Sequence, residues 1–415
     1  MISTLLITGL KRTFPALNYR NFRYFWYGQC ISLIGTWLQI TAQQWLVYTM
    51  TKSALLLGLL GFAQFGPVMF LSLFAGVFVD RYPKKLILIF IQIVSMLQAL
   101  ILAFLVWSGH IVYWEVLILA FILGLANTLD IPARQSFVPD LVEKDALRSA
   151  IGLNMAALNS ARIIGPAISA FLIVQFGTGL LFLLNGLSFI PVIYFLYLIN
   201  SKSTVIKKVE KKVLAEILEG LNYIRHSSVM LSAVLSMIVL CGLVMNFNVI
   251  IPPYAAEVLK KGVREYGLLM SAPGIGALIG SLFAASKAMG NPKISILFGS
   301  GFMASSLLIL LNFIHSLPLA VVTLTFIGFF ILLLINATNL TLQLNSSDEF
   351  RGRVMSVYSF AFSGITPIGS IFAGSITEKF GSGMGFLISG VLSGFLIVLI
   401  AINYSFKRRA QQSAI

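Results

Sequence analysis

Long apolar runs alternate with short polar segments along almost the whole chain. Each run of about 18 or more apolar residues could cross a hydrocarbon core of roughly 30 Å as a helix. The pattern predicts spans at roughly 22–47, 53–79, 86–108, 112–131, 150–174, 179–199, 229–252, 265–286, 293–314, 318–340, 353–376 and 383–405. We therefore expect an all-α membrane protein with twelve transmembrane helices in two six-helix halves.

Composition agrees with this class of protein. Of the 415 residues, 58% are hydrophobic and only 10% are charged, whereas about a quarter are charged in a soluble protein. A net charge of +15 would suggest nucleic acid as the partner of a soluble chain. Here it indicates charges at a membrane surface, so the expected partners are membrane lipid and a small molecule, with no nucleic acid.

The basic residues predict how the chain is oriented. If the N-terminus is cytoplasmic, 23 of the 29 Lys and Arg residues lie on the cytoplasmic side and 5 on the other. Short cytoplasmic loops carry such an excess of Lys and Arg. We expect a multi-pass protein of a bacterial cytoplasmic (inner) membrane with both termini in the cytoplasm. The opening "MISTLLITGLKR" has its basic residues after the apolar stretch, unlike a secretory signal.

One long charged segment falls at the midpoint and divides the chain. Its later part, with Val213, Ile217, Leu221 and Ile224 at helical spacing, predicts an amphipathic surface helix. An interaction segment is the alternative. The expected organisation is a first six-helix bundle at 1–199, a cytoplasmic linker at 200–227 and a second bundle at 228–415.

The two halves show a weak internal repeat at an offset of 204 residues. "QFGTGLLF" at 175–182 aligns with "KFGSGMGF" at 379–386, and Gly165 aligns with Gly369. Repeats of this kind, related by an axis normal to the membrane, are a known transporter architecture.

The segment "GVFVDRYPKK" resembles the 2–3 loop motif of the major facilitator superfamily, G-x-x-x-D-R-x-G-R-[KR]. Pro83 replaces the second glycine, and the matching positions are Gly76, Asp80, Arg81, Lys84 and Lys85. The resemblance implies a gating latch in which Asp80 caps a helix near Gly352 to Val354, with favourable dipole interaction. We expect Asp130 to be the partner of Arg81 in this latch, and the alternative is that it carries protons. The alternative is a basic loop that only orients the chain.

A wider resemblance covers nearly the whole chain. The segments 17–62, 130–142 ("DIPARQSFVPDLV"), 219–226 ("EGLNYIRH") and 351–359 ("RGRVMSVYS") are similar to the branch of that superfamily containing the enterobactin exporter and macrolide-efflux proteins. This resemblance implies a major facilitator fold and proton-driven efflux. It does not identify the substrate.

The segment "ARIIGPAISA" at 161–170 partly resembles the antiporter signature G-x-x-x-G-P-x-x-G-G of the same superfamily. Gly165 and Pro166 match, and other small residues replace the remaining glycines. Small residues allow close helix approach, and proline removes one backbone donor. The segment is therefore either an export hinge or ordinary small-residue packing.

A polar stripe runs along the first span, and it should face the bundle interior because polar groups facing lipid are costly. It lines a substrate cavity or joins helices by hydrogen bonds. Other spans contribute further candidates. The predicted cavity residues are Gln29, Ser32, Thr36, Gln39, Gln43, Asn154, Arg162 and Asn246.

Arg162 lies near the middle of the fifth span. A charged residue there costs about 2.5–3.5 kcal/mol on insertion scales, so it needs a partner or a wet cavity. We expect it to bind an anionic group or to respond to the coupling step. The alternative is a structural Arg that bonds carbonyl groups or asparagines.

The three histidines form no pattern of metal ligands, and no phosphate-binding loop occurs. We expect no enzyme activity, no cofactor and no metal. The sequence predicts a monomeric, secondary-active exporter of a drug-like or siderophore-like small molecule, with the proton as coupling ion. The alternatives are a lipid flippase of the same fold and a membrane receptor or scaffold that transports nothing.

Overall fold

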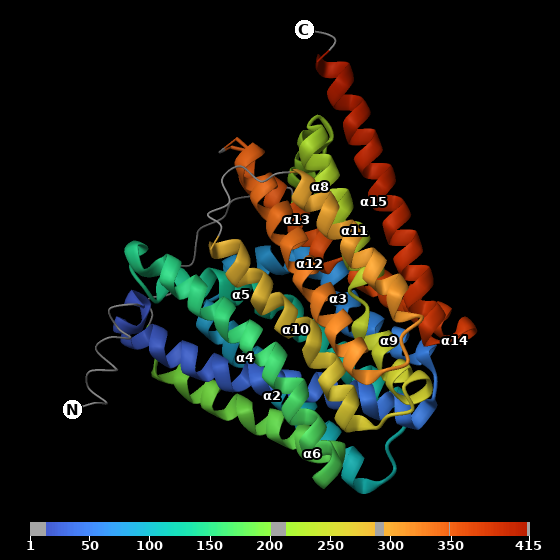
Figure 1. The fold of residues 1–415 in the computed structure, drawn as a ribbon. Coiled ribbons are helices and arrows are strands. Elements are labelled where there is room, and N and C mark those ends of the chain that lie inside the picture. The colour runs from blue at the N-terminus through green and yellow to red at the C-terminus, as the bar shows by residue number, and fades with distance from the viewer. Residues whose placement is uncertain (1–13, 201–212, 287–293, 348, 413–415) are drawn as a thin grey trace, which may run out of the picture. The chain divides into compact units, whose positions relative to one another are not determined.

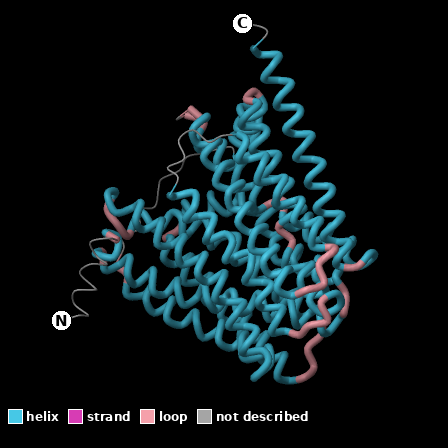
Figure 2. The backbone as a smooth tube through the Cα atoms, in the orientation of Figure 1, coloured by secondary structure: helices cyan, strands magenta, loops and turns pink. Residues whose placement is uncertain are grey.

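The chain forms helices connected by short loops. The computed structural model describes residues 14–200, 213–286, 294–347 and 349–412 (Figure 1), and these contain helices and loops without strands (Figure 2). The long helices are α2 (Arg20–Thr51), α3 (Ala54–Arg81), α4 (Lys84–Ser108), α5 (Tyr113–Phe137), α6 (Leu147–Leu198), α7 (Val213–Arg225), α8 (Ser228–Val239), α10 (Val263–Ser286), α11 (Ile294–Leu311), α12 (Leu317–Asn345), α13 (Arg351–Ser363), α14 (Thr366–Phe380) and α15 (Ser382–Gln412).

Short helical pieces complete the chain. The 3₁₀ turns are η1 (Pro15–Asn18), η2 (Val138–Asp140) and η3 (Lys144–Ala146). After α8 the helix widens into the π-helical turn η4 (Leu240–Val244), then continues as α9 (Phe247–Pro253) and a second π-helical turn, η5 (Tyr254–Val258). Such π-helical insertions often occur at functional sites.

The structure has ten segments, among the residues it describes, that are long and apolar enough to cross a membrane. The expected all-α membrane protein is therefore confirmed, although this number is lower than the twelve spans predicted. Two observations account for the difference. The segment 144–198 counts once although Gly177 interrupts it, and the polar 32-residue helix α2 is not among the ten.

The helices pack into two compact units. The first contains Met1–Gln43 and Leu71–Val209, and the second contains Gln44–Phe70 and Glu210–Ile415. The end of α2 and the first part of α3 thus pack with residues from the second half of the sequence. The expected division into bundles at 1–199 and 228–415, joined by a linker at 200–227, stays a prediction.

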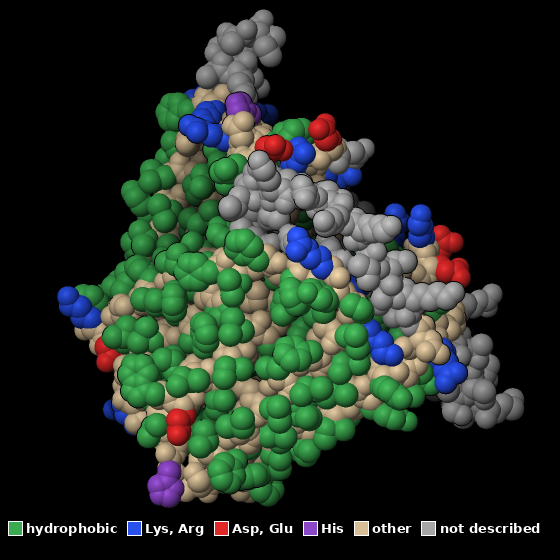
Figure 3. Space-filling view, turned by 180° about the vertical axis from the view of Figure 1, so that it is seen from behind, with side chains coloured by type: hydrophobic (Ala, Val, Ile, Leu, Met, Phe, Trp, Pro, Cys, Tyr) green, Lys and Arg blue, Asp and Glu red, His purple; other side chains and the backbone are tan. Residues whose placement is uncertain are grey.

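Within the first unit, one core lies where α2, α4, α5 and α6 meet. Phe22, Phe25, Leu88, Ile91 and Phe137 are buried in it. Phe25 packs against Phe137 with ring centroids 5.9 Å apart. The outer side of the molecule is apolar as well: in Figure 3 hydrophobic side chains cover a broad area, with charged side chains gathered around it. Such an area suits a surface in contact with lipid.

The predicted repeat has a structural counterpart in each unit. Gly177 has φ 74° and ψ 178°, and Gly381 has φ 85° and ψ 162°. Two residues later, Gly179 closely approaches Trp107 at the end of α4, and Gly383 approaches Asn312 just after α11. The matched "FG.G" segments therefore form the same corner in both units.

We expect the corner glycines to be required for stability. Their backbone conformation is nearly restricted to glycine, so Gly177→Ala or Gly381→Ala should cost about 1–3 kcal/mol. Gly152→Ala is the matched control, because this glycine has no atom within 4 Å of an added Cβ and lies within α6. Thermal unfolding of the purified protein should show both corner variants melting below wild type. Unchanged melting of both corner variants would contradict this explanation.

Candidate functional site

Gln39 on α2 joins three helices of the first unit. Its Nε2 donates to Oε1 of Gln98 on α4 (3.0 Å), and its Oε1 accepts from Nδ2 of Asn185 on α6 (2.7 Å). Gln39 is 1% exposed. At this position the polar stripe therefore connects helices, which was the second of its two sequence-based interpretations. Gln98 and Asn185 were missed, although each stands out as an amide in an apolar helix.

The other predicted cavity residues of the first unit lie at different points along α2 and α6. The Thr36 hydroxyl donates to the Ser32 carbonyl (2.9 Å), so it is used within its own helix. Gln29 Oε1, Gln43 Nε2 and Asn154 Oδ1 are buried and have no hydrogen-bond partner in the described part of the chain. These three atoms keep the capacity to bind a polar ligand group.

Asn246 belongs to the second unit and lies between η4 and α9. Its Nδ2 donates to the Gly242 carbonyl (2.9 Å), while its Oδ1 has no partner among the described residues. The side chain thus satisfies one carbonyl group where the helical pattern is interrupted.

Arg162 on α6 is half-buried against Trp37 of α2. Its guanidinium carbon lies 5.7 Å from the centroid of the Trp37 ring, within the range of a cation–π interaction. For the part of the chain that the structure describes, neither an ion pair nor a hydrogen bond of Arg162 is found. The carbonyl or asparagine partners of the alternative interpretation are therefore not observed among the described residues, and Trp37 is the aromatic neighbour of the charge.

Gly165 and Pro166 lie where α6 packs closely against α2. A Cβ added at Gly165 would clash with Cβ of Trp37, so a larger residue would require the helices to move. Ser169 one turn later donates to the Leu38 carbonyl (3.2 Å). Gly369, the repeat counterpart of Gly165, similarly approaches Gly242. These contacts are close packing, and the hinge role stays a prediction.

The two lysines of the 2–3 segment bind the ends of neighbouring helices. Lys84 Nζ lies 2.8 Å from Oδ2 of Asp140 and 2.8 Å from the Ser136 carbonyl near the end of α5. Lys85 Nζ donates to the Tyr197 and Ile199 carbonyls at the end of α6 (3.0 and 2.8 Å). Both cations thus stabilise helix C-termini, where positive charge is favourable.

The remaining members of the predicted latch are Gly76, Asp80, Arg81 and Asp130. Gly76 has nothing within 4 Å of an added Cβ, and Arg81 is exposed. The side chain of Asp80 lies outside what the structure describes. The partner expected for Asp130 is corrected: its carboxylate pairs with Arg134, one turn along α5 (2.6 Å), and accepts from Gln92 Nε2 (3.3 Å).

A carboxylate that sequence reasoning missed caps α3. It is Glu378 of α14, whose Oε2 accepts from the Ser53 hydroxyl (3.0 Å) and from the backbone N–H groups of Ala54 (2.7 Å) and Leu55 (3.2 Å). These are donors that a helix leaves unpaired at its N-terminus, where an anion is also stabilised by the helix dipole.

Glycines bring α3 and α14 into direct contact just beyond this cap. A Cβ on Gly58 would lie 2.5 Å from the Ser370 carbonyl oxygen and 3.2 Å from Cα of Gly374. Gly61 similarly approaches the Ser370 side chain. We call the set Ser53, Gly58, Gly61, Ser370, Gly374 and Glu378 the α3–α14 contact.

The end of α2 is held to the same unit by polar and aromatic contacts. The Tyr48 hydroxyl donates to Glu257 Oε1 in η5 (2.6 Å). Trp45 stacks on Tyr266 of α10 with ring centroids 5.0 Å apart. Together with the α3–α14 contact, these interactions tie the α2–α3 turn to three elements of the second half of the sequence.

The linker helix α7 packs on the beginning of α13. Arg353 forms an ion pair with Glu219 (3.1 Å), and Tyr223 stacks on Phe350 with ring centroids 4.6 Å apart. The Ser347 N–H donates to the Tyr223 hydroxyl (3.2 Å), and this bond lowers the pKa of the phenol. The amphipathic pattern thus correctly predicted a helix here. Residues 201–212 of the expected linker lie outside the described residues.

Comparisons with known proteins agree with this architecture. The chain is 23% identical to the staphyloferrin A transporter of Staphylococcus aureus over 94% of this chain and 98% of that protein. It is 24% identical to macrolide efflux protein A of Streptococcus pyogenes over 92% and 94% of the two chains.

Solved structures show the same fold at lower sequence identity. A bacterial homologue of the human lysosomal transporter Spinster, in an inward-facing and unoccupied conformation, has a TM-score of 0.73 and 14% identity, covering 94% of this chain and 96% of that one. A POT family transporter in complex with 5-aminolevulinic acid has a TM-score of 0.76 and 10% identity, with 92% and 96% coverage.

The family profile described as transmembrane secretion effector matches residues 11–414, almost the whole chain. The match agrees with the helical architecture, the repeated glycine corners and the 2–3 segment. The chain belongs to this family of major facilitator transporters.

Proposed function

We propose that the protein is a secondary-active exporter of a siderophore-like or drug-like small molecule. The observation that carries this proposal is the similarity, over more than nine-tenths of the chain, to a staphyloferrin A transporter and to a macrolide efflux protein. These two relatives differ in what their names say they move, so the similarity supports a small-molecule substrate more than its identity. The direction rests on the second name, which states efflux.

The proposed topology has twelve spans with both termini in the cytoplasm. Dividing α6 at Gly177 and adding α2 to the ten apolar segments gives this number. The excess of Lys and Arg supports the orientation. The α2–α3 turn and the α3–α14 contact then lie on the outer side, and the 2–3 segment with Asp80 and Arg81 lies on the cytoplasmic side.

Arg162 is the proposed binding group for an anionic part of the substrate. It is half-buried in a membrane-spanning helix, and Trp37 is the neighbour found for it in the described chain. A guanidinium in such a place can form two parallel hydrogen bonds with a carboxylate. The buried amide atoms of Gln29 and Asn154, which have no partner among the described residues, are further candidates.

The proposed mechanism is alternating access coupled to protons, tested with the purified protein in vesicles. One proton crossing 100 mV supplies about 2.3 kcal/mol, and 1.4 kcal/mol corresponds to a factor of ten. The voltage alone could thus sustain a gradient of roughly forty-fold for a neutral substrate. The substrate is first chosen by comparing the sensitivities of a strain lacking the protein with and without its re-expression.

We expect vesicles with an imposed proton gradient to accumulate that substrate without ATP, and a protonophore to abolish the accumulation. Sodium is varied separately, because a sodium gradient could drive the same exchange. Accumulation that persists without either gradient, or that requires ATP, would contradict the proposed mechanism.

A further inference from the structure

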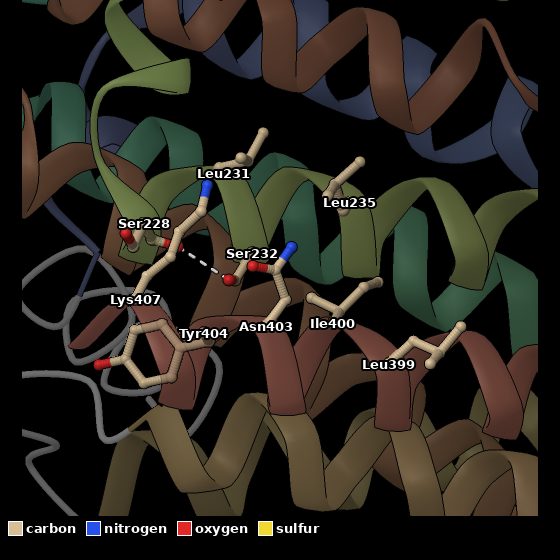
Figure 4. Close-up of a pocket in the computed structure, with 9 residues that line it drawn as sticks. All are labelled: Ser228, Leu231, Ser232, Leu235, Leu399, Ile400, Asn403, Tyr404 and Lys407. Atoms are coloured by element: carbon tan, nitrogen blue, oxygen red, sulfur yellow. Dashed lines mark hydrogen bonds between the residues drawn. The ribbon is translucent and has the colours of Figure 1, made fainter. Parts of the chain in front are cut away.

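We propose that a pocket between α8 and α15 binds an anionic phospholipid, with the lipid phosphate at Lys407. The pocket has a volume of about 140 Å³. Its lining residues come from these two helices alone (Figure 4): Ser228, Leu231, Ser232, Leu235, Leu399, Ile400, Asn403, Tyr404 and Lys407. All of them lie outside the residues considered for substrate transport, so this proposal does not depend on the proposed function.

Polarity changes along the pocket from one end to the other. In Figure 4 the side chains of Ser228, Tyr404 and Lys407 lie at one end together with Leu231, whereas Leu235 and Leu399 lie at the opposite end. Leu399 and Lys407 are eight residues apart on one helix, which corresponds to roughly 12 Å along its axis. A charged end that continues into an apolar channel matches a phospholipid, whose phosphate is followed by acyl chains.

The polar end has the charge and the donors that a phosphate requires. Lys407 contributes an ammonium group with three donors, and Ser228 and Tyr404 contribute hydroxyl groups. No lining residue is acidic. The pocket also begins at the N-terminus of α8, where the helix dipole favours an anion. The Ser232 hydroxyl already donates to the Ser228 carbonyl (2.8 Å). Its hydrogen is therefore not available to a phosphate, although the side chain keeps this end of the pocket polar.

The apolar end indicates a lipid instead of free phosphate. Leu235 and Leu399 are 37% and 45% exposed, and both helices belong to segments that can cross a membrane. Their exposed faces therefore contact acyl chains in the bilayer. An inorganic phosphate would use only the polar end, and a lysine that merely extends to the membrane surface would attract anionic headgroups no more than the nearby Arg409 does.

Native mass spectrometry of the full-length protein tests the proposal. Wild type and two variants, Lys407→Gln and Arg409→Gln, are incubated with phosphatidylglycerol or phosphatidylcholine, and bound lipids are counted. Both variants lose one positive charge from the end of α15, but Arg409 does not line the pocket. Because a hydrogen bond to a charged group is stronger than one between neutral groups, we expect wild type to prefer phosphatidylglycerol roughly tenfold or more.

The proposal predicts that Lys407→Gln loses this preference and Arg409→Gln keeps it. It also predicts that Tyr404→Phe weakens the preference in part, and that millimolar inorganic phosphate does not displace the lipid. Equal loss in Lys407→Gln and Arg409→Gln would show a diffuse charge effect and overturn the proposal. Equal binding of the two lipids by wild type, or displacement by inorganic phosphate, would also overturn it.

Discussion

Replacing Gly58 by alanine is expected to reduce transport at least roughly tenfold while the protein still folds and inserts. The added Cβ would lie 2.5 Å from the Ser370 carbonyl oxygen and 3.2 Å from Cα of Gly374. Both are backbone atoms, so the clash cannot be relieved by a side-chain rotation. One of the two helices must move, and the α3–α14 contact must open. A tenfold loss of rate corresponds to about 1.4 kcal/mol.

The same helix supplies a matched control for this prediction. A Cβ on Gly66 would meet only the Phe62 side chain, at 3.7 Å, which is ordinary van der Waals contact. Gly66→Ala should therefore transport within about twofold of wild type. Alanine in place of glycine inside a helix also stabilises the helix by about 1 kcal/mol. Flux in vesicles and thermal unfolding are measured for both variants.

Glu378→Gln separates the cap from the glycine packing. The amide keeps an acceptor oxygen for Ala54 and Leu55 but removes the anion from the helix N-terminus, an interaction that contributes about 0.3–1 kcal/mol. We therefore expect a smaller loss of transport than in Gly58→Ala. Wild-type flux in Gly58→Ala, or an equal loss in Gly66→Ala, would show that the α3–α14 contact does not participate in transport.

These contacts also show which features the sequence could predict. Helices and the Gly177 and Gly381 corners depend on local periodicity and on the backbone freedom of glycine, so both were visible in the sequence. The Asp130–Arg134 pair was also predictable, because residues four apart on a helix are neighbours. We expected Arg81 as the partner of Asp130 instead, whereas in the structure Asp130 pairs with the residue one helical turn away.

The cap by Glu378 could not be predicted in the same way. Its carboxylate meets backbone groups 323 and 324 residues earlier in the chain, so the contact depends on how distant helices pack. For Gln39 the sequence left two interpretations, because an amide facing the interior can line a cavity or bond a neighbouring helix. Only the positions of Gln98 and Asn185 decide between them.

Arg162→Ala is expected to abolish transport without lowering the yield of folded protein. An arginine inside the bilayer costs about 2.5–3.5 kcal/mol on insertion scales, so its removal makes insertion of α6 more favourable. The interaction with Trp37 that is lost contributes about 0.5–2 kcal/mol. The insertion cost that is removed and the Trp37 interaction that is lost have opposite effects on folding. The insertion cost is the larger of the two, so the balance favours folding of Arg162→Ala. Folded yield should therefore be equal to or above that of wild type.

The pair of variants Arg162→Lys and Trp37→Phe distinguishes a binding role from a structural one. Lysine keeps the charge but cannot form two parallel hydrogen bonds, so transport of an anionic substrate should be partly retained. Phenylalanine keeps an aromatic face beside Arg162, so Trp37→Phe should retain more transport than Arg162→Ala. Flux, substrate affinity and folded yield are measured for each variant. If Arg162→Ala loses folded yield in proportion to flux, or transports normally, Arg162 is structural and the substrate group binds elsewhere.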